Sequence, residues 1–556
     1  MQYINEFNLN EELKGSYKNL TGSSISLACA DIAKRSKVTL IITNNSAEAF
    51  NLEEDLKYLI GENKVYYFPD WETLPYDTFS PYQDIISRRL EILSKLSLLK
   101  DCVVIISSHC AQTRVAPRTF VNQSVINFKI GDNINLTSFQ SNLIDSGYIL
   151  VKQVLEHGEF AIRGSIIDLF PMGSNAPFRI DLFDNEIDTI HTFDLETQRS
   201  IQSIEKINIL PAHEFPTDDE AINTFRKNYR QHFKPNDISL HNIYQQISRK
   251  ILPAGIEYYL PLFFENTETI FDYLSPDTQI ILCNTNKDTL KEFFSDATSR
   301  AIKRVNNLDA PALDPQYLFL DDKNFYSKIE KFKNFHLFSQ NIETRIKKVD
   351  TLNLPPLSIN NQDQNPNQKL EEFIKEYQGK IFICAVSEGR RSILHDLIYK
   401  HIKNLNDTKN LNEFLASRKK ITLGIAPFTQ GFLTKDYAII TESELLGASY
   451  AVRKKRSRSR NINPDAIIKN LAELKVGDYV VHEQYGIAKY QGLETLKIDN
   501  IKGEFVKLIF NKEAKLFVPI TSLHLLSRYL GKDEPELTKL GTESWKKARN
   551  KALNKI

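Results

Sequence analysis

The chain has few residues of the kinds that mark secreted, metal-binding or membrane proteins. Only five cysteines occur among 556 residues, and no two of them have the C-x-x-C spacing of a structural zinc site. No apolar run approaches the roughly 18 residues that a membrane-spanning helix needs, and residues 1–20 lack the apolar core of a signal peptide. These absences predict a protein of the reducing cytoplasm that binds no metal and contacts no membrane.

No sign of charge dominates the chain either. Lys and Arg total 71 and Asp and Glu total 70, so any nucleic-acid contact would have to be local. One basic cluster exists, between residues 453 and 460. It is either a solvated linker or a contact for nucleic acid or an acidic partner, and the sequence leaves both interpretations open. Its members are Arg453, Lys454, Lys455, Arg456, Arg458 and Arg460.

The sequence also lacks a complete nucleotide site. A P-loop, G-x-x-x-x-G-K-[ST], holds phosphates with backbone N–H groups, a Lys and a metal-binding hydroxyl. The segment in the corresponding place, residues 20–27, contains a single glycine, Gly22, and no Lys. Two other Gly-Lys pairs, Gly379-Lys380 and Gly531-Lys532, are not followed by Ser or Thr. We therefore expect no ATP hydrolysis and no cofactor in this chain.

Two short acidic motifs also fall short of a catalytic site. Residues 219–222, Asp-Glu-Ala-Ile, look like a helicase acidic box but follow a polar segment, whereas magnesium binding requires the end of an apolar strand. Residues 156–159, Glu-His-Gly-Glu, fit a turn that leads into a strand better than a set of metal ligands. No G-x-S-x-G elbow and no H-E-x-x-H helix occurs.

What is present is a succession of α/β and β-rich segments, which predicts a multidomain α/β protein with β-rich modules. Short runs rich in Val and Ile, such as residues 38–42 and 103–106, are typical of buried parallel strands. The final helix ends without a cap, which we interpret as a truncation. The predicted units are an α/β part at 1–118, an inserted β-rich module at 119–211, a second α/β part at 212–344, a linker at 345–369, a small α/β domain at 370–450, a basic linker at 451–470, a small β barrel at 471–530 and the start of a helix at 531–556.

One strand of the inserted module carries a candidate docking face. Residues 178–183 alternate, so that one face is apolar and the other carries Arg179, Asp181 and Phe183. Exposed aromatic and Arg side chains are typical interface anchors, and Arg163 on a nearby predicted strand would extend the face. The alternative is that Phe183 packs beneath a neighbouring domain, and the pattern alone does not decide between the two.

The predicted barrel offers a second candidate. Thr495, Leu496 and Lys497 lie on a predicted strand whose edge could pair with a strand of a partner, although Leu496 would equally suit the barrel core. The five predicted strands are residues 479–482, 487–490, 493–498, 505–510 and 516–519, separated by glycines and polar turns.

Several long, ordered blocks of sequence resemble the Mfd family of bacterial transcription-repair coupling factors. The resemblance extends over essentially all 556 residues. It is strongest in residues 68–77, 156–164, 168–173 and 210–216 and, within the barrel, in residues 480–487 and 518–525.

The resemblance implies a fold and partners for each part. Residues 1–344 are similar to the excision-repair protein UvrB and should form a split, degenerate RecA-like α/β domain that contains the β module. In the family that module binds UvrA, and the matching positions here are Arg163, Arg179 and Phe183. The barrel resembles a Tudor/SH3-like fold that binds the β subunit of RNA polymerase, with Leu496 and its neighbours as candidate contacts.

The family function implied for this amino-terminal part is that of a non-catalytic adaptor between stalled RNA polymerase and UvrA. A missing carboxy-terminal part would be an ATP- and magnesium-dependent DNA translocase that displaces the polymerase. After Tyr82 the chain leaves no space for the long aromatic hairpin with which UvrB clamps DNA. A UvrB-like, DNA-binding ATPase is the alternative function.

Overall fold

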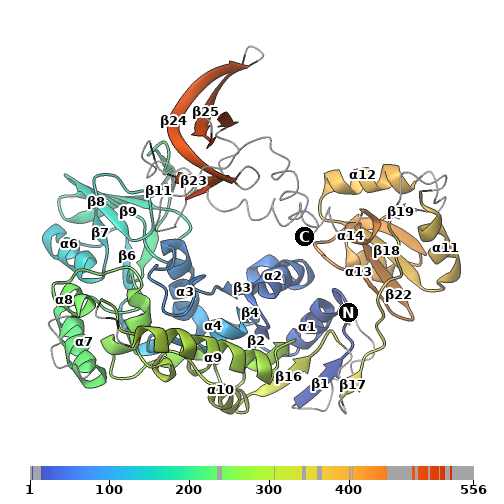
Figure 1. Ribbon diagram of the computed structural model, residues 1–556, viewed down its shortest axis with the longest axis horizontal. Coiled ribbons are helices and arrows are strands. Elements are labelled where there is room, and N and C mark those ends of the chain that lie inside the picture. The colour runs from blue at the N-terminus through green and yellow to red at the C-terminus, as the bar shows by residue number, and fades with distance from the viewer. Residues whose placement is uncertain are drawn as a thin grey trace. The chain divides into compact units, whose positions relative to one another are not determined.

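The computed structural model divides into two units, residues 1–447 and 448–556 (Figure 1). It describes residues 3, 14–233, 241–305, 307, 309–340, 346–359, 366–399, 402, 405–446, 477, 479–482, 486–498, 501–511, 514–519 and 526–528. The first unit is a mixed α/β structure with several sheets, as the sequence predicts. Within the described residues, no helix has the length and apolar character that crossing a membrane requires.

A seven-stranded parallel sheet forms the base of the first unit. Its central strands are rich in Val and Ile and are buried along their whole length, because helices cover both faces of the sheet. Helices α1 (Ser24–Ala33) and α2 (Ser46–Ile60) pack on one face, and α3 (Gln83–Leu96) and α9 (Lys287–Arg304) pack on the other. In order across the sheet, the strands are β17 (Lys347–Lys348), β1 (Lys14–Lys18), β16 (Lys333–Leu337), β15 (Gln279–Cys283), β2 (Val38–Thr43), β4 (Cys102–Ser107) and β3 (Val65–Phe68).

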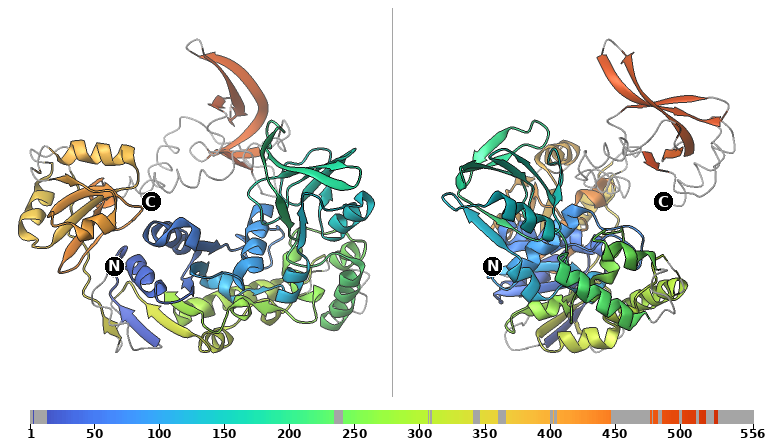
Figure 2. Two further views of the ribbon diagram at one scale, coloured as in Figure 1. Left: turned by 180° about the vertical axis from the view of Figure 1, so that it is seen from behind. Right: turned by 90° about the vertical axis from the view of Figure 1, so that its left-hand side faces the viewer.

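The chain between β4 and β15 contains a six-stranded sheet, drawn in teal in Figure 2. Neighbouring strands pair in antiparallel fashion except for the parallel pair at one edge. Alternate side chains are buried, as the sequence pattern predicts for residues 178–183. In order, the strands are β12 (Ser200–Ser203), β11 (Glu186–Phe193), β10 (Phe178–Phe183), β9 (Ile166–Leu169), β8 (Glu159–Arg163) and β7 (Ile149–Leu150).

The inner face of this six-stranded sheet shares one core with other parts of the chain. Ile180 on β10 belongs to the same buried cluster as Phe225 and Tyr229 on α7 (Asp219–His232) and as Trp71 in the loop after β3. A shared core of aromatic side chains fixes the sheet to the remainder of the first unit, because separating them would expose the whole cluster to water.

A buried carboxyl group in this region makes stability depend on pH. Glu257, on the 3-10 helix η3 (Ile256–Phe263), is 6% exposed and accepts a hydrogen bond from Ser80 Oγ at 2.8 Å. Burial raises the pKa of the Glu257 carboxyl from its ordinary value of 4.5 to about 7. Between these two pH values the folded protein keeps a proton that the unfolded chain releases. The stability that this proton contributes is fully present below pH 4.5 and is lost as the pH rises through 7.

We therefore expect Glu257→Gln to flatten the pH dependence of unfolding. In urea titrations of the wild-type chain, Glu257 should lower the free energy of unfolding by roughly 1–2 kcal/mol between pH 5 and pH 7. The glutamine variant should lose that slope, and Glu265→Gln, at an exposed position, should keep it. A slope that survives in Glu257→Gln would show that another group is responsible.

A third, five-stranded sheet lies in residues 380–441. Its helices include α12 (Glu388–Ile398), which Ser387 caps by accepting a hydrogen bond from the backbone N–H of Arg390, as the sequence predicts. The other helices are α11 (Gln368–Glu376), α13 (Leu411–Ala416) and α14 (Glu442–Leu446). In order, the strands are β19 (Asn406–Asp407), β20 (Ile421–Ile425), β18 (Lys380–Ala385), β22 (Tyr437–Thr441) and β21 (Phe432–Leu433).

The segment predicted as a linker at 345–369 is partly packed. Strand β17 adds Lys347 and Lys348 to the edge of the first sheet, and Val349, Thr351 and Leu357 are buried. Part of the predicted linker is therefore packed, because its few apolar residues join buried clusters of the first and third sheets. The asparagine-rich residues 360–365 lie outside the described residues.

The second unit contains a five-stranded antiparallel sheet. The sequence predicts two strands separated at Gly492, but in the structure they form one strand of 13 residues, β24. The register shifts between Tyr490 and Leu493, and Gly492 has a φ of 107°, so the glycine forms a β-bulge within the strand, and the predicted break is wrong. In order, the strands are β26 (Lys515–Pro519), β25 (Ile501–Ile509), β24 (Gly486–Ile498), β23 (Tyr479–His482) and β27 (Leu526–Arg528).

Candidate functional site

The candidate docking face of the β module is organised around a buried carboxylate that is not among the predicted contacts. Asp168 on β9 is fully buried and lies directly across from Arg179 on β10. Its Oδ1 accepts a hydrogen bond from Arg179 Nε at 2.7 Å, and its Oδ2 accepts one from Arg179 Nη2 at 3.0 Å. Arg163 Nη2 donates to the same Oδ2 at 2.6 Å. One carboxylate therefore orients two of the three predicted UvrA contacts.

The two arginines differ in exposure. The side chain of Arg163 is 53% exposed, whereas that of Arg179 is 18% exposed. Arg179 also donates to the carbonyl oxygen of Gln198 at 3.1 Å and lies 5.1 Å from the ring centroid of Phe193. Its hydrogen bonds to Asp168 are the largest cause of its raised pKa. Arg179 is thus held in place and is only partly exposed.

Phe183, by contrast, is 75% exposed in the first unit. It ends β10, where it pairs with Glu186 across a tight turn in which Asp184 has a φ of 52°. The neighbouring Leu182 donates its N–H to Ser165, in the turn that follows Arg163, at 3.0 Å. The register therefore brings Phe183 and Arg163 to the same end of the sheet. In the first unit Phe183 does not pack beneath a neighbouring domain.

A sequence signal for Asp168 exists. A carboxylate within the apolar run 166–169 needs a cationic partner if it is buried, and Arg179 lies on the next predicted strand along the chain. Periodicity could not select that partner, because cross-strand register depends on the length of the connecting turn.

The second candidate surface lies on β24 in the second unit. Thr495, Leu496 and Lys497 pair with Glu504, Gly503 and Lys502 of β25. On the other side, β23 pairs with β24 only as far as Lys489. Among the described strands, the stretch from Leu493 to Ile498 therefore has one neighbour and one open edge. The side chains of the three predicted contacts lie outside the described residues, as does the whole basic cluster at 453–460.

The remaining candidate motifs have structural roles. His157 forms hydrogen bonds with Asp84 Oδ1 and with the carbonyl oxygen of Ser174, both at 2.8 Å, just before β8 begins. Residues 219–222 form the first turn of α7, which Asp218 caps. In the part of the chain that the structure describes, no group of three or more His, Cys, Asp or Glu side chains could hold a metal ion.

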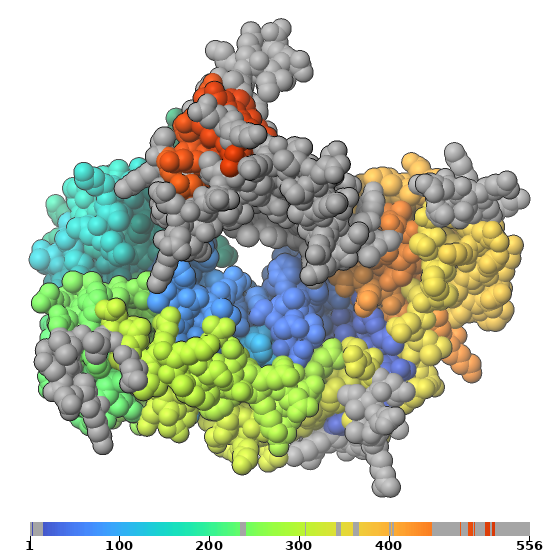
Figure 3. Space-filling view, in the orientation of Figure 1, coloured from blue at the N-terminus to red at the C-terminus, as the bar shows by residue number. Residues whose placement is uncertain are grey.

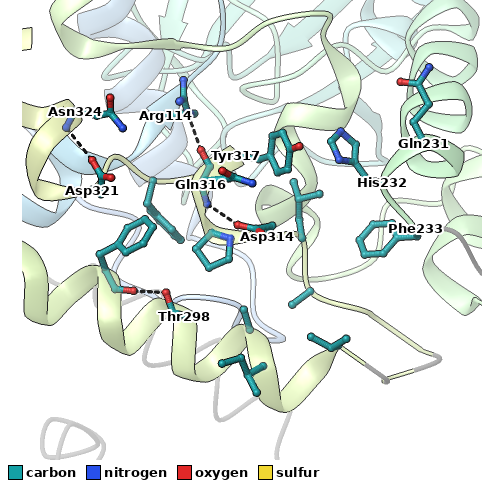
Figure 4. A pocket seen from close by; sticks show the side chains of 18 residues that line it. Arg114, Gln231, His232, Phe233, Thr298, Asp314, Gln316, Tyr317, Asp321 and Asn324 are labelled. Atoms are coloured by element: carbon teal, nitrogen blue, oxygen red, sulfur yellow. Dashed lines mark hydrogen bonds between the residues drawn. The ribbon is translucent and has the colours of Figure 1, made fainter.

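A cavity of about 810 Å³ lies between α9, the end of α7 and the short η5 helix (Pro315–Tyr317), as Figure 4 shows. Its wall includes His232, which packs edge-to-face on Tyr317 with ring centroids 4.3 Å apart. Arg114 donates from Nε to the carbonyl oxygen of Gln316 at 3.4 Å. None of the predicted site residues lines this cavity.

Comparison with known proteins places these surfaces in matched domains. Residues 126–215 match the UvrB interaction domain, residues 373–445 match the MFD D3 domain, and residues 474–530 match the CarD-like/TRCF RID domain. The first match contains Arg163, Asp168, Arg179 and Phe183, and the third contains the open edge of β24.

Curated relatives match along nearly the whole chain. It is 38% identical over 552 residues to a transcription-repair-coupling factor of Haemophilus influenzae, which covers 97% of this chain and 47% of the relative. The corresponding protein of Escherichia coli is 37% identical over 545 residues, with 97% and 47% covered, and that of Rickettsia prowazekii is 29% identical over 529 residues, with 93% and 46% covered. The chain spans about half the length of these relatives, and it belongs to the family of transcription-repair coupling factors.

Proposed function

We propose that this chain is a non-catalytic adaptor for transcription-coupled nucleotide excision repair. The β module recruits UvrA through Arg163, Arg179 and Phe183, and the sheet of the second unit binds the β subunit of RNA polymerase through the open edge of β24. ATP, magnesium and the translocation of DNA belong to the part of such proteins that this chain does not span. The family membership and the matched UvrB interaction and RID domains support this assignment.

The observation that carries the proposal is the exposed Phe183 at the same end of the sheet as Arg163, which shares the buried Asp168 with Arg179. An aromatic ring on a rigid strand loses little conformational entropy when a partner covers it. Asp168 holds both guanidinium groups in place before any partner arrives, so the cost of ordering them has already been met within the fold. A partner surface with an apolar pocket and a carboxylate would complement this arrangement.

A pull-down of the chain with purified UvrA and with RNA polymerase tests the adaptor function directly. We expect both partners to be captured separately, and UvrA binding to weaken as salt is raised from low to physiological concentration, because Arg163 is an exposed charge. An adaptor must bind both partners, so failure to capture one of them would reject this function. A UvrB-like ATPase, the alternative, is not favoured by the comparisons.

The polymerase surface gives a separate prediction. Leu496→Asp should weaken binding to the β subunit about tenfold or more, because it places a charge at the centre of the proposed strand-pairing edge. The variant should bind UvrA normally, since the two surfaces lie in different units. Lys515→Asp, on the edge strand β26 at the other side of the sheet, is the matched control. Equal loss in both variants would show that charge alone, and not the β24 edge, decides binding.

A further inference from the structure

The loop that precedes α1 occupies the position of a P-loop, and protein atoms take up its backbone donors. The N–H of Leu20 donates to the carbonyl oxygen of Phe338 at 3.0 Å, that of Thr21 to Thr351 Oγ1 at 3.1 Å, and that of Ser23 to the carbonyl oxygen of Gln430 at 3.0 Å. In a working P-loop such amides hold the phosphates of a nucleotide. Here a phosphate would have to displace hydrogen bonds that the fold already makes.

One side of the loop is closed by the packed segment that follows β17. Asn19 donates from Nδ2 to the carbonyl oxygens of Val349 at 2.9 Å and of Thr351 at 2.6 Å. Thr351 is fully buried. The next residue, Leu352, exchanges two backbone hydrogen bonds with Leu433, at the end of β21 in the third sheet. This segment therefore connects the loop, which belongs to the domain of the seven-stranded sheet (the first domain), to the domain of the five-stranded sheet at 380–441 (the third domain).

The other side of the loop is closed by the backbone of the third domain itself. Gly22 has a φ of 54°, and a Cβ built on it would lie only 2.3 Å from the carbonyl oxygen of Gly431. Only glycine permits this approach. Gly431 is braced in turn, because its N–H donates to Glu444 Oε1 at 2.8 Å, and the other carboxylate oxygen accepts the N–H of Thr441 at 2.8 Å.

Further contacts join the two domains around this point. The Tyr58 hydroxyl on α2 accepts the backbone N–H of Leu411 at 2.7 Å, and the Tyr58 ring packs edge-to-face on Phe428 with centroids 5.7 Å apart. Side chains of α1 and α2 share a buried cluster with those of β18, α13 and β22. Figure 3 shows the orange and yellow surface of the third domain against the blue surface of the first.

We propose that the Gln430–Gly431 loop is an internal plug, which takes the place of nucleotide phosphates at residues 19–24 and fixes the third α/β domain to the first. Protein contacts, and not a bound nucleotide, thus fix the arrangement of the first and third domains. Gly22, the single glycine in residues 20–27, permits the close contact with Gly431. This inference does not depend on the adaptor function.

Hydrogen exchange of the full chain, analysed by peptide, tests the plug. In the wild type the amides of Thr21 and Ser23 should be protected although they lie in a loop. Gly22→Ala should accelerate exchange about tenfold or more in residues 19–24 and 428–433, because the added methyl group displaces Gly431. Gly61→Ala is the matched control, since Gly61 also has a positive φ, 105°, but has nothing within 4 Å of its Cβ position.

Three results would overturn the proposal. One is fast exchange of the Thr21 and Ser23 amides in the wild type, and another is equal acceleration in Gly22→Ala and Gly61→Ala, which would reflect backbone strain alone. The third is protection of residues 19–24 in the wild type by inorganic pyrophosphate with magnesium, which would show an open site.

If Gly22→Ala also accelerates exchange in the buried central strand β4, the variant is unfolding as a whole. A milder variant then decides the test. Tyr58→Phe removes only the hydroxyl that accepts the N–H of Leu411. It should accelerate exchange in residues 411–416 and 428–433 and leave β4 protected. Unchanged exchange in both peptides would contradict the proposed coupling of the two domains.

Discussion

Replacement of Arg89 by Met is expected to lower the free energy of unfolding of the first unit by about 3–5 kcal/mol. The Arg89 side chain is 1% exposed, and its Nε donates to Glu214 Oε1 at 2.8 Å. Its guanidinium also donates to the carbonyl oxygen of Pro69 at 2.9 Å and lies 4.5 Å from the ring centroid of Phe68. Without Arg89, the buried Glu214 carboxylate would keep the Trp71 indole N–H, at 2.7 Å, but no cation.

Urea unfolding of the full chain measures this effect, and Arg88→Met is its matched control. Arg88 is the preceding residue, but its side chain is 36% exposed and its partner is Glu91, so its replacement should cost about 0–1 kcal/mol. The double variant Arg89→Met with Glu214→Leu should be less destabilised than the sum of the two single changes, because it leaves no buried charge unpaired. Equal losses in Arg88→Met and Arg89→Met would contradict the buried ion pair.

This ion pair shows which features of the fold the sequence could not predict. The buried strands at 38–42 and 103–106, the alternation of residues 178–183 and the Ser387 cap all follow from local patterns, and the structure has them. Arg89 and Glu214 are 125 residues apart, and no periodicity relates them. Their pairing depends on how the β module and the first sheet share a core, which is a property of tertiary packing.

The same distinction applies to the candidate sites. Local alternation was sufficient to place Phe183 on an outer face, and the structure has it exposed. The sequence did not assign Asp168 to the site, because burial of a carboxylate is stable only with the register that brings Arg179 across from it. The absence of a P-loop Lys could be read from residues 20–27, but the contact of this loop with Gln430 is a long-range one that no local pattern signals.

Phe183→Ala is expected to weaken UvrA binding by at least about 2 kcal/mol, or roughly thirtyfold in Kd. The ring is 75% exposed before binding, so the change removes apolar area that only a partner would bury. Because no partner within the first unit is lost, the free energy of unfolding should change by less than about 0.5 kcal/mol. Titration calorimetry with purified UvrA, together with urea unfolding, separates the two effects.

Ile201→Ala is the control that makes this result specific. Ile201 is 69% exposed on the edge strand β12, which β11 separates from the β10 strand of Phe183, so a general loss of surface hydrophobicity would weaken both variants alike. Adding Arg179→Ala to Phe183→Ala should weaken binding further, but it also leaves the buried Asp168 with Arg163 as its remaining cation. The double variant must therefore be compared at matched stability. UvrA binding that survives both changes in a folded protein would exclude this face as the docking surface.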